Sequence, residues 1–545
     1  MRKILAVLVA VGVTFAGGMA VPALVTADAT SGQTITKCTT ISEAGHYTLG
    51  QNLTSTAGES CLQIESSDVV LDGAGYSLSG GGNGVAIDVS ANEVRAQDTY
   101  QNVTVRDVRL ESWETGVSLV NTRNATISGI EVTNTTTGVE VGNTSVLRPG
   151  YPASADGTTI RESTFVGNED GVIIKISEGI DVAENQFVDS QLGVNLDESG
   201  TEDIDITQNA VENSTIKVSD GSGYEPDISV KSNEIQDGTI VIRQADNTSI
   251  ANNFVRTTGT TTAGNPGIVV GMTDGATVAN NTVTGSGTGI LLDTGTREAS
   301  VKNNTVHDVG TGIEIYDSVD ATVQNNTITD TETGVELSFL ATGHTISGNE
   351  IRDNDAGISL GRYAENNVIE ENRIIDNVDG VKISVLESVN GDANIVRGND
   401  ILDNTDGVDV FATVTPVVVE SNNVSDNKNG VHVHSPAACY ADSAEGAELV
   451  SVHGNDLRDN NAYGVINEDP DTLNATGNYW GASDGPSSAN DSDAPFSDPV
   501  TGTLANGTGS AVSENPDDAG VTNVHFDSYR ESPIDDVGVH EETAT

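Results

Sequence analysis

Basic residues are scarce in this chain of 545 residues, which has 24 Lys and Arg against 81 Asp and Glu and a formal net charge of −57. Binding to nucleic-acid phosphates needs a basic face, so the composition excludes nucleic acid as a partner. The acidic residues are spread over the whole chain, which favours adaptation to molar salt, where carboxylates keep a surface hydrated and their repulsion is screened. An acidic secreted surface that binds cations is the alternative.

Cysteine is also rare, with three residues in the chain. Cys38 and Cys61 are separated by about one period of the repeat described below, and in an exported chain we expect them to form a disulfide. Cys439 would then stay unpaired.

Long apolar runs are absent after the first 27 residues. That first run follows Met1-Arg2-Lys3 and ends at Ala27-Asp28-Ala29, as in a secretory signal peptide with an Ala-x-Ala cleavage site. The run is long enough to span a bilayer, so an uncleaved anchor is the alternative. We expect residues 1–29 to be a signal peptide and the mature chain to be secreted, extracellular or at the cell surface, with no transmembrane segment.

Aromatic residues make up only 4% of the chain, which suits a narrow core better than a wide one. What the sequence has instead is a repeat of about 22 to 24 residues, Val/Ile-x-x-Asn-x-Val/Ile, followed eight residues after the Asn by Gly-Val/Ile-x-Val/Leu/Ile. Each repeat contains three short apolar alternations, which predict three short strands rather than helices. Three strands with tight bends close one coil, and stacked coils form a parallel β-helix.

The Asn of this frame recurs in phase through most of the chain, at positions 185, 209, 233, 253, 281, 304, 326, 349, 372, 399, 422, 455 and 478. An Asn at an inward bend can bond to the coils above and below. We therefore expect Asn281, Asn304, Asn326 and Asn349 to stack in an internal ladder. The Gly of the frame is expected at a tight bend or at positive φ, and both residue types are expected to be scaffold.

The repeat covers residues 62–480 and predicts one elongated domain. Residues 30–61 precede the regular pattern and are expected to cap the first coil, because a solenoid end otherwise exposes its core and strand edges. At the other end Trp480 occupies an apolar position of the last frame, as a plug would. Residues 481–545 are expected to be an acidic, loop-rich segment with a final capping strand at 521–526.

Three motifs carry a family resemblance: the Asn-x-Val/Ile rungs, the run from Val69 to Tyr76 (VVLDGAGY) after Cys61, and the run from Gly477 to Gly481 (GNYWG). With them the chain resembles exported archaeal right-handed β-helix proteins of the NosD-like group, with repeats of the carbohydrate-binding and sugar-hydrolysis (CASH) type. The resemblance implies an all-β fold, a single-stranded right-handed parallel β-helix of roughly 16 to 18 coils, with export and a halophilic source. Members of the group include enzymes on polysaccharides, surface proteins and a periplasmic factor linked to copper-site maturation.

The strand after each frame Gly points every second residue outward, so successive coils place these side chains in one column. In its later part this column is polar and contains Glu314, Glu336, Ser359, Lys382, Asp409 and His432. We expect these residues to point to water and to form any binding site on this face. Insertions at 142–157, 386–393 and 435–448 all follow this strand and would flank the column, where loops on a rigid scaffold carry function.

Two groups in the column suggest catalytic chemistry. Glu314 and Glu336 would lie about 5 Å apart on adjacent coils, near the separation used by retaining glycosidases, although a solvated acidic face gives the same pattern. Lys382, Asp409 and His432 offer the base and cation that a lyase or epimerase on uronate polymers needs, with Ca²⁺ as a candidate cofactor. The chain lacks the Asp-Pro-His-Asp, Gly-His-Gly and Arg-Ile-Lys signatures of better known β-helix enzymes. These five residues are the catalytic candidates, and the sequence leaves open whether the protein is an enzyme.

His432 and His434 form an i, i+2 pair, which places both imidazoles on one face of a strand. Zn²⁺ or Cu²⁺ accepts such a pair, and His453 or Cys439 are candidates to complete a site. The two histidines are therefore the metal candidates, with Cu²⁺ as the second candidate cofactor. A pair of exposed histidines without a metal is the alternative.

The sequence favours an extracellular or cell-surface β-helix protein that binds polysaccharide or another surface polymer along this column. The first alternative is a polysaccharide lyase, epimerase or glycoside hydrolase that uses the same face. The second alternative, which rests on the resemblance, is a copper-handling maturation factor of the periplasmic type.

Overall fold

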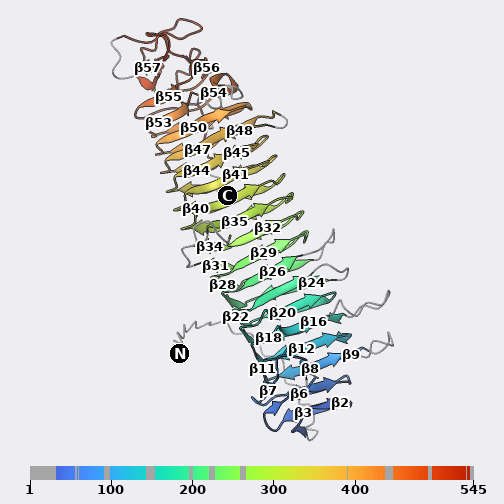
Figure 1. The fold of residues 1–545 in the computed structure, drawn as a ribbon. Coiled ribbons are helices and arrows are strands. Elements are labelled where there is room, and N and C mark those ends of the chain that lie inside the picture. Colours follow the sequence, from blue (N-terminus) through green and yellow to red (C-terminus); the bar gives the residue numbers. More distant parts are fainter. Residues whose placement is uncertain are drawn as a thin grey trace.

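The fold is an elongated rod of stacked coils, built almost entirely from short strands (Figure 1). This computed structural model describes residues 32–55, 58, 60–90, 99–142, 154–195, 201–219, 227–257, 266–285, 287–388, 391–435, 446–488, 494–535 and 537–539. The predicted all-β parallel β-helix is confirmed. The expected signal peptide at 1–29 lies outside the described residues. Within them, no helix has the length and apolar character needed to cross a bilayer.

Each regular coil contributes one strand to each of three sheets, and neighbouring coils pair in parallel. Sheet A contains 20 strands, in spatial order β1 (Gln33–Ile35), β3 (Gly45–Leu49), β6 (Val69–Asp72), β10 (Thr104–Arg106), β14 (Thr126–Ser128), β18 (Thr159–Arg161), β21 (Glu178–Ala183), β24 (Glu202–Thr207), β27 (Ile228–Lys231), β30 (Ser249–Ala251), β33 (Thr277–Ala279), β36 (Ser300–Lys302), β39 (Thr322–Gln324), β42 (Thr345–Ser347), β45 (Val368–Glu370), β48 (Asn394–Arg397), β51 (Val417–Glu420), β54 (Val450–His453), β56 (Leu473–Asn474) and β59 (Val524–His525).

Sheet B is formed by the strand that follows the frame Gly. Its 20 strands are β2 (Thr39–Ile41), β5 (Leu62–Ile64), β8 (Val85–Ser90), β12 (Thr115–Val120), β16 (Thr137–Val141), β20 (Asp170–Lys175), β23 (Gln191–Asn195), β26 (Thr215–Ser219), β29 (Thr239–Arg243), β32 (Ile268–Gly271), β35 (Thr288–Asp293), β38 (Thr311–Tyr316), β41 (Thr333–Ser338), β44 (Ala356–Leu360), β47 (Asp379–Val385), β50 (Asp406–Thr413), β53 (Asn429–Val433), β55 (Tyr463–Asn467), β58 (Gly509–Val512) and β57 (Pro486–Ser488).

Sheet C lies between sheets A and B in each coil and contains 16 strands. They are β4 (Leu53–Thr54), β7 (Ser77–Ser79), β11 (Arg109–Glu111), β15 (Glu131–Thr133), β19 (Thr164–Val166), β22 (Gln186–Val188), β25 (Ala210–Glu212), β28 (Glu234–Gln236), β31 (Phe254–Arg256), β34 (Thr282–Thr284), β37 (Thr305–His307), β40 (Thr327–Thr329), β43 (Glu350–Arg352), β46 (Arg373–Ile375), β49 (Asp400–Leu402) and β52 (Asn423–Ser425). A small fourth sheet contains β9 (Tyr100–Gln101), β13 (Thr122–Arg123) and β17 (Ala155–Asp156), and a short 3-10 turn η2 spans Ala447–Leu449.

The core is a narrow column of aliphatic side chains, one set per coil. In the coil of β39, β40 and β41, the inward residues Val323, Ile328, Val335 and Leu337 are all fully buried. Coil after coil repeats this arrangement, which explains why the chain needs few aromatic rings. The composition therefore reflects the core width, as the sequence predicted.

The predicted asparagine ladder is confirmed and is longer than the four residues named for it. Asn326 Nδ2 donates to Asn349 Oδ1 at 3.0 Å and to the Val301 carbonyl at 3.0 Å. Its own Oδ1 accepts the Asn304 backbone N–H and side-chain amide, both at 2.9 Å. The same links run from Asn185 to Asn478 through all thirteen in-phase asparagines. Each bend thus satisfies its buried polar groups with the next coil.

A second ladder, which the sequence analysis missed, lies at the following bend. It consists of Asn354, Asn377, Asn404, Asn427 and Asn460, joined by side-chain amide bonds of 2.9 to 3.2 Å. Each lies five residues after an asparagine of the first ladder, and that spacing is the signal that would have revealed it.

The frame glycines were expected at a tight bend or at positive φ. They do not have positive φ, and it is the close approach of the next coil that requires glycine. A Cβ on Gly312 would lie 2.4 Å from the Gly334 carbonyl oxygen and 2.6 Å from the Ile328 side chain, without any positive φ. Close approach of the next coil therefore excludes a side chain here. Positive φ occurs instead at the residue before each ladder asparagine, as at Asn303 and Asn325.

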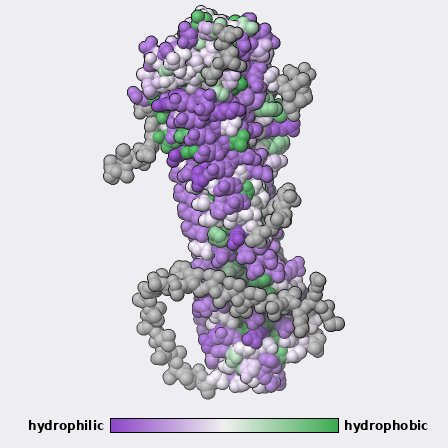
Figure 2. All heavy atoms as spheres, turned by 90° about the vertical axis from the view of Figure 1, so that its left-hand side faces the viewer, coloured by the Kyte–Doolittle hydropathy of each residue, from purple (hydrophilic) through white to green (hydrophobic). Residues whose placement is uncertain are grey.

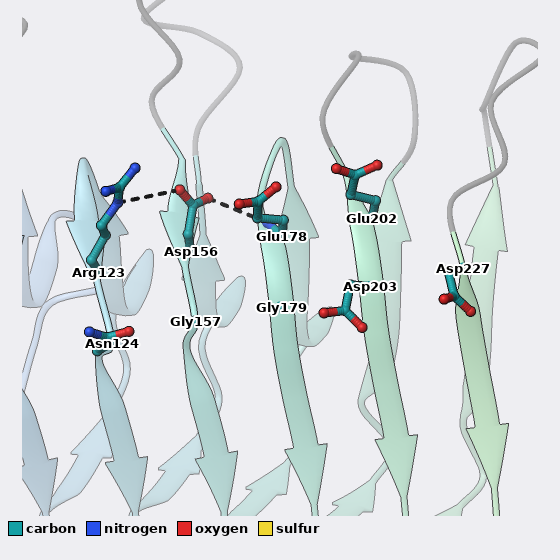
Figure 3. A pocket seen from close by; sticks show the side chains of 9 residues that line it. All are labelled: Arg123, Asn124, Asp156, Gly157, Glu178, Gly179, Glu202, Asp203 and Asp227. Carbon is teal, nitrogen blue, oxygen red and sulfur yellow. Dashed lines mark hydrogen bonds and ion pairs between the residues drawn. The ribbon is translucent and has the colours of Figure 1, made fainter.

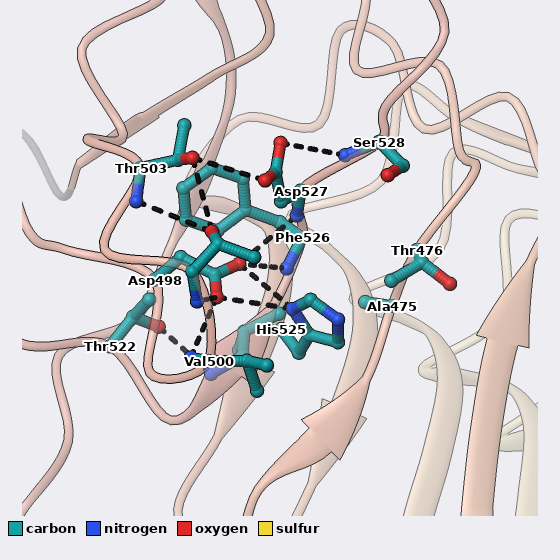
Figure 4. A network of polar contacts seen from close by, with 12 residues as sticks. Ala475, Thr476, Asp498, Val500, Thr503, Thr522, His525, Phe526, Asp527 and Ser528 are labelled. Carbon is teal, nitrogen blue, oxygen red and sulfur yellow. Dashed lines mark hydrogen bonds and ion pairs between the residues drawn. The ribbon is translucent and has the colours of Figure 1, made fainter.

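The two ends of the rod have additional cross-links. Cys38 and Cys61 are joined by a disulfide, and Trp480 is fully buried in the last regular coil. Beyond it, the carboxylate of Asp498 is fully buried and accepts backbone N–H groups of Val500, Thr501, Phe526 and Asp527 at 2.8 to 3.0 Å (Figure 4). His525 Nδ1 lies 3.0 Å from the same carboxylate. Burial alone would raise the pKa of Asp498, but these hydrogen bonds hold it below its usual range.

The side of the rod that Figure 2 shows is mainly hydrophilic. Figure 2 shows one long side on which hydrophilic residues dominate and hydrophobic patches are small and separated. Apolar groups that do gather on the surface are therefore informative.

Candidate functional site

The six column residues of the sequence analysis lie in register on the outer face of sheet B. Successive strands pair Glu314 with Glu336, Glu336 with Ser359, Ser359 with Lys382, Lys382 with Asp409, and Asp409 with His432. Parallel pairing of equal-length repeats produces this alignment. The same column is polar in the first coils, at Asp88, Ser118 and Glu140, and is then apolar or small from Ile173 to Leu291 apart from Lys217.

The expectation that the whole column points to water is wrong at its end. The Lys382 side chain is 41% exposed, whereas those of Asp409 and His432 are 5% and 11% exposed. They are covered because His434 folds over Asp409, with Nε2 2.6 Å from Oδ1, and stacks against His432 at 3.7 Å between ring centroids. Ring packing between coils cannot be read from repeat spacing.

A second polar column, also missed, runs three residues before the first and contains Asp379, Asp406 and Asn429. Asp379 Oδ2 lies 2.6 Å from Lys382 Nζ, and Asn429 Nδ2 donates to Asp406 Oδ1 at 2.6 Å. These three residues directly precede the frame Gly, and that position is the signal that would have found them. The basic residue of the column is thus already paired.

Burial and crowding shift the pKa values around Lys382. Burial raises the pKa of Asp379, helped by the charges of Asp409 and Asp406 and opposed by Lys382. Burial alone would lower the pKa of Lys382, but its hydrogen bond to Asp379 and the surrounding carboxylates raise it instead. The hydrogen bond to Asp409 raises the pKa of His434. The carboxylates of the cluster thus raise the pKa of both Lys382 and His434.

The Glu314–Glu336 pair lies in mid-column. Burial raises the pKa of Glu336, and the charge of Glu314 on the adjacent coil raises it further. Thr288 Oγ1 donates to Glu314 at 3.3 Å. The two carboxyl groups thus lie in different environments. The acid and the base of a glycoside hydrolase differ in this way, and so do two carboxyl groups on a crowded acidic face.

Of the two proposed additions to the histidine pair, His453 does not join it, and the prediction for Cys439 is not tested. His453 lies in sheet A, with Nε2 3.1 Å from Glu420, and Cys439 lies outside the described residues. Asp409 is instead the third group: one ligand atom from each of Asp409, His432 and His434 lies within 4.8 Å of the others.

An aromatic row, defined as Tyr316, Phe339 and Tyr363, lies beside the polar column. It is at the C-terminal ends of the sheet B strands β38, β41 and β44. The Tyr316 and Phe339 rings stack at 5.6 Å, and Phe339 meets Tyr363 edge to face at 5.5 Å. Tyr316 is 36% exposed and Phe339 is 37% exposed. Tyr316 follows Glu314 by two residues in β38, so both side chains point outward from sheet B. The sequence analysis missed this row because it considered rings only as core residues.

A hollow lies elsewhere, where sheet B passes into sheet A in earlier coils. It is lined by Arg123, Asp156, Glu178, Glu202, Asp203 and Asp227, whose side chains come from successive coils (Figure 3). Arg123 Nε lies 3.8 Å from Asp156. None of the column residues lines it, so the hollow and the column are separate surfaces.

Comparisons with known proteins agree with this geometry. The fold defines a right-handed parallel β-helix protein, and the family described as "right handed beta helix region" matches residues 151–306, 228–337 and 288–445, together more than half of the chain. The chain belongs to this family. The family "periplasmic copper-binding protein (NosD)" matches residues 51–225, a segment that contains neither His432 nor His434. No curated protein matches the chain.

Among solved structures, the mannuronan C-5 epimerase AlgE6 A-module of Azotobacter vinelandii is 15% identical, with a TM-score of 0.24 over 69% of this chain and 85% of that chain. The periplasmic alginate epimerase AlgG is 14% identical, with a TM-score of 0.28 over 68% and 82%. A mutant tailspike protein of E. coli bacteriophage HK620 is 12% identical, with a TM-score of 0.31 over 70% and 71%. At these TM-scores and identities, the likeness implies nothing about the chemistry of this chain.

Proposed function

We propose that this protein binds an extended polysaccharide along the outer face of sheet B, over the coils from β38 to β53, outside the cell or at its surface. The observation that carries this proposal is the aromatic row beside the polar column. Exposed rings in a row offer flat apolar faces for sugar rings, and neighbouring carboxylates and hydroxyls accept and donate hydrogen bonds to sugar hydroxyls. A rigid rod keeps these groups in line for a long ligand.

The backbone at the aromatic row is in a conformation that is costly for large side chains, as it is at bends along the whole rod. Phe339 has a φ of 29° and Tyr363 a φ of 62°, both in the left-handed region. A bulky residue there costs about 1 to 2 kcal/mol, and such positions gather at ligand sites. A glycine or asparagine would relieve the cost but would remove the ring.

The charges of the surface indicate the class of polysaccharide. Glu314, Glu336, Asp406 and Asp409 line the face, and its one lysine is paired with Asp379. An anionic polymer would be repelled, since like charges across an interface are costly. The surface therefore favours a neutral polysaccharide.

The second candidate function is cleavage or modification of the bound polymer. The observation in its favour is the raised pKa of Glu336 beside Glu314, which would suit a general acid next to a carboxylate. In this case Glu336→Gln should abolish turnover and leave binding within about threefold, because only the proton donor is lost.

The test is a polysaccharide array with the full chain, followed by product analysis on every hit. We expect neutral polysaccharides to be retained with unchanged length and linkage, and uronate polymers to be released. Shortened or altered products would replace the first candidate with the second. Retention of uronates alone, or of no polysaccharide, would contradict the proposal.

A further inference from the structure

Asp409, His432 and His434 bring three metal-ligating side chains together at the end of the polar column. Asp409 lies in β50, His432 in β53 on the next coil, and His434 just after β53. His434 Nε2 is 2.6 Å and His432 Nδ1 is 4.0 Å from the same oxygen, Asp409 Oδ1. Two imidazoles and one carboxylate within 4.8 Å match the donor set of transition-metal sites.

His432 is the unusual member of this group. The residue is 91% buried, from a relative exposure of 9%, yet neither ring nitrogen makes a hydrogen bond. Buried polar side chains almost always have a partner, and one imidazole nitrogen must be a donor. Its Nδ1 lies 3.4 Å from Asp406 Oδ1 and 4.0 Å from Asp409 Oδ1. An ion there would supply the missing partner.

Glu468 lies beside both imidazole rings. Its two oxygens lie 3.5 Å from His432 Nε2 and 3.4 Å from His434 Nδ1. Each ring thus has one nitrogen on the side of Asp406 and Asp409 and the other nitrogen near Glu468. Metal-bound histidines commonly donate their second N–H to a carboxylate in this way, which fixes the tautomer and the ring orientation.

The surrounding charge favours a dication. Asp406 Oδ1 lies 3.4 Å from His432 Nδ1, so two carboxylates face the ligand nitrogens. The nearby Lys382 is bonded to Asp379 and does not neutralise them.

We infer that Asp409 Oδ1, His432 Nδ1 and His434 Nε2 bind one divalent transition-metal ion, with Glu468 as the positioning residue. Imidazole ligands favour Zn²⁺ and its first-row neighbours over Ca²⁺, which takes six to eight oxygens. The inference is independent of polysaccharide binding. Relative to the site predicted from the sequence, it keeps His432 and His434, adds Asp409 and Glu468, and excludes His453.

The test is a calorimetric titration of chelator-treated full-length protein with Zn²⁺, in about 1 M NaCl and excess Mg²⁺ to suppress loose binding to surface carboxylates. We expect one ion per chain. His434→Gln and Asp409→Asn should each weaken binding about 100-fold or more, because loss of even an outer partner costs about 10- to 100-fold. The matched control His453→Ala, a histidine beside a carboxylate in sheet A, should bind like the wild type.

Co²⁺ gives a second readout that does not depend on affinity. Bound in this donor set, it should give visible absorption bands that His434→Gln abolishes and Glu468→Gln weakens. His434 is the preferred variant because its side chain is partly exposed and its loss leaves the coil intact. Absence of stoichiometric Zn²⁺ binding, or equal loss in the His453→Ala control, would overturn the inference and leave the cluster as imidazoles held by neighbouring carboxylates.

Discussion

The inner and outer sides of the coils carry polar groups of two different kinds. Inside, thirteen asparagines repeat the same contact at every coil from Asn185 to Asn478. Outside, the column of sheet B changes from apolar at Val269 to acidic at Glu314 and to histidine at His432. Repetition is needed where each group must bond to its copy in the next coil. Variation is tolerated where the scaffold no longer constrains the side chain, and function is expected there.

This comparison predicts that inward and outward substitutions affect different properties of the protein. Substitutions of inward polar groups should lower stability and leave binding intact, whereas outward substitutions should do the opposite. The following predictions run from the largest expected effect to the smallest.

Asp498→Asn should have the largest effect, since it places an amide NH₂ against two of the four backbone N–H donors in a buried network. Breaking a buried charged network typically costs about 3 to 5 kcal/mol. In a solenoid this loss should stay local, so hydrogen exchange should show early opening of the C-terminal segment and an unchanged central rod. The exposed Asp484, which accepts hydrogen bonds from Thr508, provides the control Asp484→Asn. Equal opening in both variants would contradict the role of Asp498.

His344 makes the inner side sensitive to pH. Burial lowers its pKa to about 4, although hydrogen bonds to Ser318 and Ala321 oppose the shift. Because the folded pKa is below the unfolded value of about 6.5, the stabilisation is complete above that pH and declines as the pH falls towards 4, by about 3 kcal/mol in total.

The variant His344→Asn isolates this contribution. Asn would extend the short ladder formed with Asn367 and Asn394 and cannot titrate. We expect the unfolding free energy of the wild type to fall more steeply than that of the variant between pH 7 and pH 4. Parallel curves would show that His344 is not the titrating group.

Asn326→Leu should cost about 1 to 3 kcal/mol, because it leaves Asn304 and Asn349 without their partners. Chemical denaturation measures this loss. Polysaccharide affinity should be unchanged, since the side chain is buried. A variant as stable as the wild type would mean that the ladder does not contribute.

These predictions rest on features that differ in how far the sequence revealed them. The first ladder was predictable because Asn326 and its equivalents recur at a fixed spacing. The alignment of Glu314 with Glu336 followed from the same spacing. The burial of His432 was not predictable, because it depends on how His434 folds back over Asp409. The aromatic row was also hidden, since Phe339 belongs to a turn outside the repeating frame.

Lys382→Ala should have the smallest effect. Its ammonium group is partly exposed and already bonded to Asp379, so we expect neutral polysaccharide affinity to fall by less than about 1 kcal/mol. Lys217 lies in the same outward column but in β26, outside the proposed surface, and Lys217→Ala is the matched control. Equilibrium binding of both variants checks this. A large loss for Lys217→Ala would move the site towards the N-terminal coils.

The most direct test of the central claim compares two exposed phenylalanines of the same rod. Phe339 belongs to the aromatic row of sheet B, whereas Phe254 lies on sheet C and is 42% exposed. We predict that Phe339→Ala weakens binding of the neutral polysaccharide about tenfold, from a ring contribution of roughly 1.4 kcal/mol, and that Phe254→Ala binds like the wild type. Both variants should melt at nearly the wild-type temperature. Wild-type affinity for Phe339→Ala, or an equal loss for Phe254→Ala, would contradict the assignment of binding to this face.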